Sequence, residues 1–501
     1  MKSALKVFAG VCLLLFWGGL VSCSNDTESA VIDITPIIAY DTTTVTDDSL
    51  SPEEIKMLYK MREPDHRISG AEIVTLIDNV IGILDEETGL KSGDGRKVRS
   101  ITPLVSENSK AVALKSGGEP EIEIPDTLAY VVNFEDSLGF AILAADTRVE
   151  QPVLGFVDQG SLIDSTDNPG IALVLESLEN HILNSIIETE KLKDSLLNEI
   201  LEKLETESGT KAMGLALSVT ESPWNTISKV SPLIPVEWGQ GPPYNNNVGG
   251  KCSGDGTAEN GKYWAGCVAT AVAQIMAYWK YPAKISNYSL DWNTLIQYTG
   301  MQNSNSSDGR AKKDINTAPA TIKNQIATLF RQIGKEIYMD YGCKGSSAQR
   351  ISALKFLRKH GFNMPLLPIE DVPITLDYNS DDVINSLNKR RPLMIEGCSE
   401  KINHKFLGIT IYTTHDNCHD WVMDGYLKQK KTITLRIGSK ILVNEVYTDY
   451  LHNNWGWDGD KDGYFISGIF DARQEPALAS NTKSNEDYNY QYKLNVGYIW
   501  R

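Results

Sequence analysis

The chain has 501 residues, and its 65 acidic against 48 basic side chains give a formal net charge of −17. This charge excludes nucleic acid as a partner, because phosphate binding needs clustered Lys and Arg and the sequence shows no basic patch. A composition of 41% hydrophobic and 23% charged residues is typical of a globular protein, and the length predicts about two to four domains.

The first 23 residues predict export. Lys2 and Lys6 precede an apolar run that is too short for an ordinary membrane span and that ends in Leu-Val-Ser-Cys at 20–23. This ending resembles the lipobox, where a bacterial signal peptidase cuts before the cysteine and the cysteine receives lipid. We therefore predict a lipoprotein signal peptide over 1–22 and a membrane anchor on Cys23, facing the periplasm or the cell surface unless processing releases the chain. A plain signal peptide and a short anchor helix are the alternatives.

An α+β unit is predicted between an acidic tether over 23–50 and a polar linker over 206–214. Ser51 and Pro52 predict the start of a short helix, and apolar residues at helical spacing predict a second helix over 70–87. Two or three β-rich runs over 128–162 predict an antiparallel sheet. The charged amphipathic pattern over 171–207 predicts one or two helices.

The part of the chain after residue 213 is rich in Trp and Tyr and holds five cysteines. Because five is an odd number, at least one thiol stays unpaired or pairs outside the chain. The five are Cys252, Cys267, Cys343, Cys398 and Cys418.

Cys267 follows Gly266 at the head of an apolar run that ends at Pro282. Apolar residues recur there at helical spacing and predict a helix with one buried face, formed by Val268, Val272, Ile275, Met276 and Trp279. Gly266 lets the backbone turn into this helix, whose first turn favours a thiolate through its unpaired N–H groups and positive dipole end. A nucleophilic thiolate also needs a base and donors for an oxyanion. The alternative is a small buried core residue.

Among the seven histidines, His419 has the most distinctive surroundings. It begins "HDWVMDGY", a strand-like alternation that ends in the turn signal Asp424-Gly425. Downstream, "NNWGWDGDKDGYF" places an Asn-Trp pair before a loop rich in Gly and Asp, and such a pair can orient and shield an imidazole. His360 is predicted to cap a helix C-terminus instead.

Five segments, in order along the chain, resemble the streptopain family of papain-fold cysteine peptidases. They are "WGQGPPYN" (238–245), "GCVATAVAQIMAYWKYP" (266–282), "MDYGCKGSSAQRISALKFLRKHGF" (339–362), "HDWVMDGY" (419–426) and "NWGWDGDKDGYF" (454–465). The upstream "GFAILAADTRVEQPVLGF" (139–156) is similar to the inhibitory prodomain of the family. The resemblance implies an α+β fold: a papain-like peptidase domain over 214–501, with a helical part and an antiparallel sheet part, preceded by an α+β inhibitory prodomain over 51–213.

The resemblance also implies the chemistry. Cys267 would be the nucleophile and His419 the general base and acid. Gln240, together with the backbone N–H of Cys267, would stabilise the oxyanion, at about 3 kcal/mol for each donor.

Further roles follow from the same resemblance. Asn454 would orient the imidazole, with its neighbour Asn453 as an open alternative, and Trp455 would cover their hydrogen bond. Gly266 and Trp457 would lie at the substrate cleft.

The segment 398–418 departs from the family pattern, because it is longer than the family's approach to the histidine. It predicts a loop near the cleft that alters substrate choice, is cleaved, or is closed by a disulfide between Cys398 and Cys418. His415 is a minor alternative base. The spacing of His404, His415 and the two cysteines matches no standard zinc pattern, so we assign no metal and no cofactor.

The sequence thus predicts an exported cysteine endopeptidase made as an inactive zymogen. Its partners would be protein or peptide substrates, its own prodomain as an intramolecular inhibitor, and the membrane through Cys23. Cleavage within 205–230 would activate it. Two alternatives stay open: a transglutaminase-like acyl transferase on the same fold, and a catalytically silent surface lipoprotein used as a binding module.

Overall fold

The computed structural model describes residues 6–7, 50–63, 65–89, 95–105, 122, 124–162, 168–208, 217–300, 313–367, 372–406, 409–437, 440–470 and 494–501. Cys23 and, apart from residues 6–7, the whole predicted signal peptide lie outside these ranges, as does the tether up to residue 49. No helix within them combines the length and the apolar character that crossing a membrane requires. Below, residues 50–208 are called the N-terminal unit and residues 217–501 the C-terminal unit.

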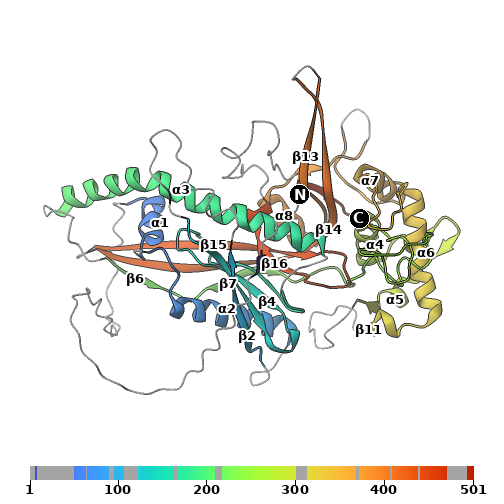
Figure 1. Cartoon of the computed structure of the whole chain (residues 1–501), viewed down its shortest axis with the longest axis horizontal. Helices are drawn as coiled ribbons and strands as arrows, with labels where there is room; N and C mark the ends of the chain where they lie inside the picture. The colour runs from blue at the N-terminus through green and yellow to red at the C-terminus, as the bar shows by residue number, and fades with distance from the viewer. Residues whose placement is uncertain are drawn as a thin grey trace.

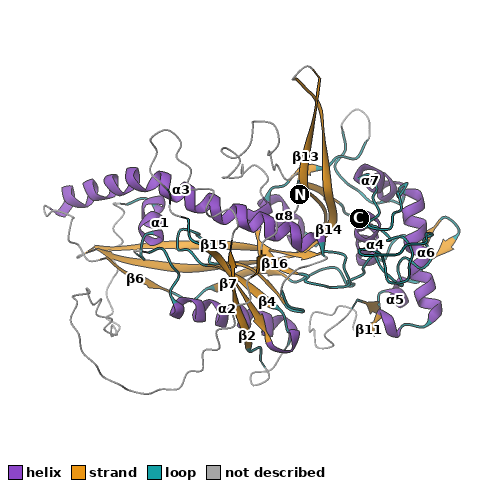
Figure 2. Cartoon of the chain, viewed as in Figure 1, coloured by secondary structure: helices purple, strands orange, loops and turns teal. Residues whose placement is uncertain are grey.

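One antiparallel sheet runs through both units (Figures 1 and 2). Its strand order is β1-β2-β3-β4-β5-β16-β15-β14-β13-β17-β12, and β6 and β7 pair with β14. The strands are β1 Lys6–Val7, β2 Val98–Val105, β3 Thr127–Phe134, β4 Phe140–Ala144, β5 Val153–Val157, β6 Leu217–Glu221, β7 Asn225–Val230, β12 Leu376–Asp377, β13 Leu393–Phe406, β14 Ile409–Ile437, β15 Lys440–Asn454, β16 Gly463–Ile466 and β17 Asn495–Tyr498. The two units join where β5 pairs with β16.

Helices cover this sheet in two groups. Figure 1 shows α4–α7 gathered at one end of the C-terminal unit, while the long α3 runs beside the sheet. The helices are α1 Pro52–Lys60, α2 Gly70–Thr88, α3 Pro169–Ser208, α4 Cys267–Trp279, α5 Trp292–Leu295, α6 Ala320–Glu336, α7 Arg350–Lys359 and α8 Ser380–Asn388. Short 3₁₀ helices cover Glu135–Ser137, Ile315–Thr317 and Ser467–Phe470, and two small ribbons pair β8 Lys284–Ile285 with β9 Tyr288–Ser289 and β10 Tyr298–Thr299 with β11 Lys313–Asp314. The predicted α+β fold, with a helical part, an antiparallel sheet part and a preceding α+β unit, is confirmed.

Local signals placed most helix starts correctly. The Ser51 hydroxyl accepts a hydrogen bond from the Glu54 N–H at 3.3 Å, and the Glu54 carboxylate accepts one from the Ser51 N–H at 2.7 Å. This reciprocal pair caps α1 as predicted. The region predicted as one or two helices is the single helix α3, which extends through Ser208 into the predicted linker.

Two predictions about β14 need correction. The predicted turn at Asp424-Gly425 is wrong, because β14 continues to Ile437 and the pairing with β15 only shifts register between Met423 and Gly425, as at a β-bulge. The predicted loop before His419 is instead the outer part of the β13–β14 hairpin, which stands out from the molecule in Figure 1.

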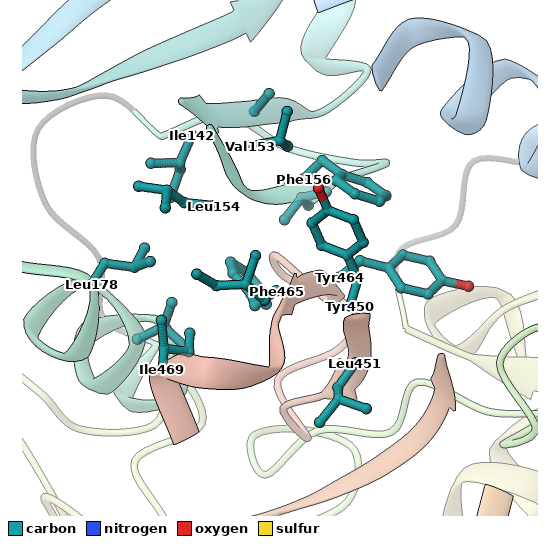
Figure 3. Packing of buried hydrophobic residues seen from close by; sticks show 14 of the residues in the cluster. Ile142, Val153, Leu154, Phe156, Leu178, Tyr450, Leu451, Tyr464, Phe465 and Ile469 are labelled. Atoms are coloured by element: carbon teal, nitrogen blue, oxygen red, sulfur yellow. The ribbon is translucent and has the colours of Figure 1, made fainter. Parts of the chain in front are cut away.

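The largest hydrophobic core belongs to both units. Figure 3 shows Ile142, Leu154 and Phe156 of β4 and β5 facing Tyr464 and Phe465 of β16. The rings of Phe156 and Tyr464 stack at 5.3 Å. Full burial of one such side chain contributes about 1.5–3 kcal/mol, so the N-terminal unit is held by packing as well as by strand pairing.

A second core surrounds α4. Every residue from Val268 to Ala277 is buried, so this helix is covered on all sides rather than on the single predicted face. Helices α6 and α7 contact one side of it, and β13 and β14 contact another. This burial fixes the start of α4, where Cys267 lies, against the sheet.

A third core lies on the far part of the β14–β15 hairpin, residues 426–437 and 440–450, which we call the arm. Leu50 and residues of α1 and α3 pack on it. Leu50, Ile55, Tyr59 and Ile200 contact the arm residues Ile433, Leu435, Ile437, Leu442 and Val446. Beside them, the buried Lys431 ammonium donates to the Tyr59 hydroxyl at 2.7 Å and to the Glu221 carboxylate at 2.6 Å. The N-terminal unit therefore grips the C-terminal unit at the arm as well as at β16.

We predict that Lys431→Met destabilises the full chain by about 1–3 kcal/mol, because Glu221 and Tyr59 lose a charged partner at a largely buried site. Urea unfolding followed by tryptophan fluorescence measures the change. Lys430→Met is the matched control, since Lys430 is solvated and pairs with Glu445 on the same arm. Equal losses in the two variants would show that the buried network adds nothing.

Candidate active site

Cys267 is the first residue of α4, and Gly266 is its N-cap. Gly266 has a φ of +95°, and a Cβ at this position would lie 2.7 Å from Met339 Cε and 3.1 Å from the Ser346 carbonyl. Only glycine fits this turn without strain. Gly266 thus aims the start of α4 so that Cys267 points to the sheet.

The other four cysteines of the C-terminal unit form disulfides. Cys252 pairs with Cys343, and Cys398 pairs with Cys418, so Cys267 is the one free cysteine among the described residues. The odd count had predicted an unpaired thiol, and this is confirmed. Cys398 and Cys418 are direct register partners on β13 and β14, one residue before His419.

The surroundings of the Cys267 thiol keep it protonated. Burial raises the pKa of this thiol to about 12, and the Asp420 carboxylate acts in the same direction. The main-chain N–H groups of Asp420, Val268 and Cys267 lower the pKa by less. The N–H groups at the start of α4 thus act on the pKa of the thiol in the expected direction, but desolvation in this arrangement outweighs them.

His419 lies on β14, opposite Gly397 of β13, and is 3% exposed. Its Nε2 hydrogen-bonds the main-chain oxygen of Trp455 at 2.8 Å. Its ring lies nearly parallel to the indole of Trp421, at 6.1 Å and 14°. Burial lowers the pKa of the imidazole to about 4, against a smaller upward effect of the Trp455 carbonyl, so the ring is neutral at pH 7.

His419 and Cys267 face opposite sides of the β13–β14 pair. Side chains alternate along a strand, and the β14 residue whose carboxylate and N–H act on the thiol is Asp420. On the other side, a Cβ on Gly397 would collide with Leu173 of α3 and approach Trp421 to 2.9 Å. The imidazole is thus on the side that the N-terminal unit covers. No hydrogen bond between His419 and Cys267 exists within the described ranges.

The predicted Asn-Trp unit lies beside His419, but the contacts differ from the expected ones. The Asn454 side chain accepts a hydrogen bond from Gln274 at 2.8 Å and donates one to the Val236 carbonyl at 3.0 Å. The other candidate, Asn453, accepts from the Trp421 indole N–H at 2.8 Å. The imidazole is oriented by the main chain of Trp455 instead of by either amide.

Trp455 is fully buried and is itself firmly held. Its main-chain N–H donates to Asp462 and its indole N–H to the Lys461 carbonyl, both at 2.8 Å. Gly170 of α3 packs so closely on its ring that a Cβ there would collide with it. The N-terminal unit therefore packs against the residue whose carbonyl forms the hydrogen bond with His419.

Gln240 is near the start of α4, as predicted. Its carbonyl accepts from the Ala265 N–H at 3.0 Å, two residues before Cys267, and the residue is 6% exposed. Gln274 Nε2 also donates to the Trp238 carbonyl at 3.1 Å. Gln274 therefore connects Asn454 to residues 238–241, which we call the Gln240 segment. Gln274 was not predicted as a site residue, although a lone glutamine two turns after Cys267, on the same helix face as the thiol, was a usable signal.

Two further contacts border the site. Trp457 packs on Trp264 with ring centroids 5.4 Å apart. The Arg350 guanidinium donates to the Asp420 carboxylate at 2.8 and 3.0 Å. Burial nevertheless raises the pKa of Asp420 to about 6, since desolvation outweighs the lowering by Arg350, and Glu396 raises it further.

Metal binding finds no support in the part of the chain that the structure describes, where no three His, Cys, Asp or Glu residues are placed to hold an ion. The side chains of residues 401–417, including His404 and the alternative base His415, lie outside the described set.

The chain matches one protein-family model and is similar to several known proteins. Residues 238–465 match the model of the Peptidase C10 family. Streptopain of Streptococcus pyogenes is 23% identical over 444 residues, which cover 83% of this chain and 88% of that protein. The thiol protease/hemagglutinin PrtT of Porphyromonas gingivalis is 23% identical over 354 residues, or 69% of this chain and 34% of that protein. A solved fragment of Prevotella intermedia prointerpain A has a TM-score of 0.41 and 20% identity, and the alignment covers 75% of this chain and 96% of the fragment.

We predict that iodoacetamide alkylates Cys267 slowly in the intact chain at neutral pH. The thiolate is the reactive form, so the rate should rise about tenfold for each pH unit below the thiol pKa. Peptide mass spectrometry after timed quenching gives the rate, and Cys267→Ala provides the unlabelled control. Fast alkylation that does not change between pH 6 and 8 would contradict a protonated thiol.

We predict that the two disulfides differ in how much they stabilise the fold and in whether they order the main chain around His419. In the chain-entropy view, the wider Cys252–Cys343 loop contributes about 4–5 kcal/mol and the shorter Cys398–Cys418 loop about 3 kcal/mol. Removing Cys252–Cys343 by a double Ser substitution should lower the urea midpoint more. Removing Cys398–Cys418 should instead raise hydrogen exchange at 418–421, measured by mass spectrometry. If both double variants change exchange there equally, the second disulfide has no local effect on His419.

Proposed function

We propose that the chain is an exported cysteine endopeptidase made as an inactive zymogen, because residues 238–465 match the Peptidase C10 family model and the chain is similar to streptopain. Residues 51–213 would form its inhibitory prodomain and residues 214–501 its peptidase domain. The observation that carries the proposal is the placement of a free thiol at the start of α4 and a buried imidazole on the adjacent strand, separated by the sheet that both contact.

In the proposed reaction the Cys267 thiolate attacks the carbonyl carbon of a peptide bond. Gln240 Nε2 and the Cys267 N–H stabilise the oxyanion, and the His419 imidazolium protonates the leaving amine. Water, activated by His419, then hydrolyses the thioester and releases the acid and the thiol. Proteins and peptides are the substrates, and the chemistry uses no cofactor.

The positions of Trp455, Asn454 and Trp457 suggest supporting roles. Trp455 would keep water from the imidazole and orient it through its carbonyl. Asn454 would act through Gln274, because this pair connects the His419 segment to the Gln240 segment. Trp457, paired with Trp264, and Gly266 would border the substrate cleft.

In this proposal the zymogen is inactive because the N-terminal unit holds His419 on the side of the sheet that faces away from Cys267. The N-terminal unit packs Leu173 over the Gly397–His419 pair and Gly170 on Trp455. The Asn168 side chain, which accepts the first N–H groups of α3, donates to the Asp460 carbonyl at 2.6 Å. With these contacts gone, the β14 main chain at His419 would be free to turn over and carry the imidazole to the side of Cys267, where the two groups would stabilise each other as an ion pair.

Activation would require a cut between the two units. Helix α3 ends at Ser208 and β6 begins at Leu217, so the proposed region of 205–230 narrows to 209–216. The lipid anchor on Cys23, and with it export to the periplasmic face or cell surface, remains part of the proposal on sequence grounds alone.

We predict that an epoxide inhibitor of cysteine peptidases labels the chain from Ser24 to Arg501 only after limited proteolysis between the two units. Intact mass before and after digestion gives both the label and the cut. Cys267→Ala should stay unlabelled, His419→Ala should label slowly after the cut, and His360→Ala, a helix-capping variant remote from His419, should behave as wild type.

Three outcomes would revise the proposal. If the inhibitor labels the uncut chain as fully as the cut chain, the proposed latency is wrong. Absence of labelling after the cut would favour the silent binding module. Labelled enzyme that transfers its acyl group to an added amine without hydrolysing peptide would favour the acyl transferase.

A further inference from the structure

Asp458 lies in the loop between β15 and β16, directly after Trp457. Its φ of +57° is in the left-handed region, where a side chain other than Gly is uncommon but Asp is tolerated. The residue therefore adopts a conformation that its surroundings must support, and these surroundings belong to the segment that carries Gln240.

The loop between β15 and β16 packs closely against the Gln240 segment at positions where only glycine fits. A Cβ on Gly239, the neighbour of Gln240, would collide with the Asp458 carboxylate, and one on Gly300 would collide with the Asp458 main chain. In the reverse direction, a Cβ on Gly459 would lie 2.7 Å from Glu237 Oε2. The Asp458 carboxyl thus rests directly on the backbone next to the proposed oxyanion donor.

The groups around this carboxyl are acidic or neutral. The fully buried Tyr244 phenol lies beside it and beside the Gly239 main chain. Glu237, Asp314 of β11 and Glu259 are the charged groups that act on it. On its own loop, Asp460 is paired with Lys461, and the Asp462 carboxylate accepts the Trp455 N–H. Among the described residues no cation forms an ion pair with Asp458, and its Oδ1 is buried without a hydrogen-bond donor.

Such surroundings favour the neutral carboxylic acid. Burial raises the pKa of Asp458 to about 7, Tyr244 lowers it, and Glu237, Asp314 and Glu259 raise it further. Below this pKa the carboxyl packs as a neutral group. Above it, a negative charge lies beside Glu237 with Oδ1 buried and without a hydrogen-bond donor, which costs free energy.

We infer that Asp458 is a positioning residue that, as a neutral acid packed on Gly239, seats the Gln240 segment for oxyanion binding and releases it on ionisation. The inference rests on the proposed function, because it concerns the same oxyanion site. Loss of one such donor typically costs about 10²–10³-fold in kcat, while substrate binding in the ground state changes little. The expected signature is therefore a fall in kcat as pH rises through about 7, with KM nearly constant.

The test compares the processed wild type with Asp458→Asn, which is uncharged at every pH. Wild-type kcat should fall up to about tenfold per pH unit above the Asp458 pKa, and Asp458→Asn should stay level over the same range. Asp460→Asn, an exposed acid of the same loop, is the matched control and should follow the wild type. An unchanged fall in Asp458→Asn would overturn the inference, as would an Asp458→Asn enzyme that is folded but inactive at all pH values.

A second measurement does not depend on activity. Hydrogen exchange of peptides covering 238–241, corrected for the intrinsic pH dependence, should lose protection between pH 6 and pH 8.5 in the wild type but not in Asp458→Asn. Stability follows the same sign. The folded-state pKa of Asp458 is raised from 3.8 to about 7, so wild-type stability falls as pH rises between these two values and is level above them, and the variant should lose less. If the processed wild type hydrolyses nothing, the proposed function fails, and the exchange result still decides whether Asp458 seats this segment.

Discussion

The hydrogen bond between His419 and the Trp455 carbonyl is the interaction on which the rest of the site depends. Strand alternation places the imidazole on the side of β14 that α3 covers, and this bond fixes the ring there, while Cys267 faces the side of Asp420. Separation and burial together keep both groups uncharged, because desolvation raises the pKa of the thiol and lowers that of the imidazole. A thiolate–imidazolium pair forms in a dry site only when each charge stabilises the other, so keeping the groups apart is enough to keep both inactive.

The N-terminal unit can hold this arrangement because the two units share one sheet and one hydrophobic core. Strand β5 continues the sheet from β16, the largest core contains residues of both units, and α1 and α3 pack on the arm. A single cut between residues 208 and 217 breaks none of these contacts. Release of the N-terminal unit is thus a separate step, which exposes apolar surface on the arm and leaves β16 as an edge strand of only four residues, short enough to resist pairing with other chains.

The sequence predicted much of this arrangement where a signal is local or acts through chemical pattern. The Ser51 cap, the helix beginning at Cys267, the unpaired thiol and the α+β character of the N-terminal unit follow from spacing, capping residues and cysteine parity, whereas the α+β class of the whole chain was implied by the family resemblance. The errors lie where long-range contacts override local preference. Asp424-Gly425 is a turn signal in isolation, but β6, β7 and β15 pair along β14 and keep the strand extended past it. The sequence also placed Cys267 at the start of a helix and His419 on a strand, as in the structure. No local pattern tells, however, on which side of the strand His419 lies, or that desolvation outweighs the dipole of α4.

Two carboxyls border the candidate site, and their partners differ: Asp420 is buried, and Asp458 is half-buried with its Oδ1 enclosed. Asp420 has the planar guanidinium of Arg350, which donates twice to one oxygen, and the pair is anchored further by the Asn495 carbonyl at 2.6 Å from Arg350. Asp458 has a phenol and three acids. A guanidinium remains charged at any pH a protein meets, so Asp420 keeps a partner whether or not it ionises. Asp458 lacks such a partner, and its packing on Gly239 is compatible with only one of its two protonation states. The side of the site that carries Gln240 is therefore the side whose geometry depends on pH, whereas the side that carries His419 depends on the N-terminal unit.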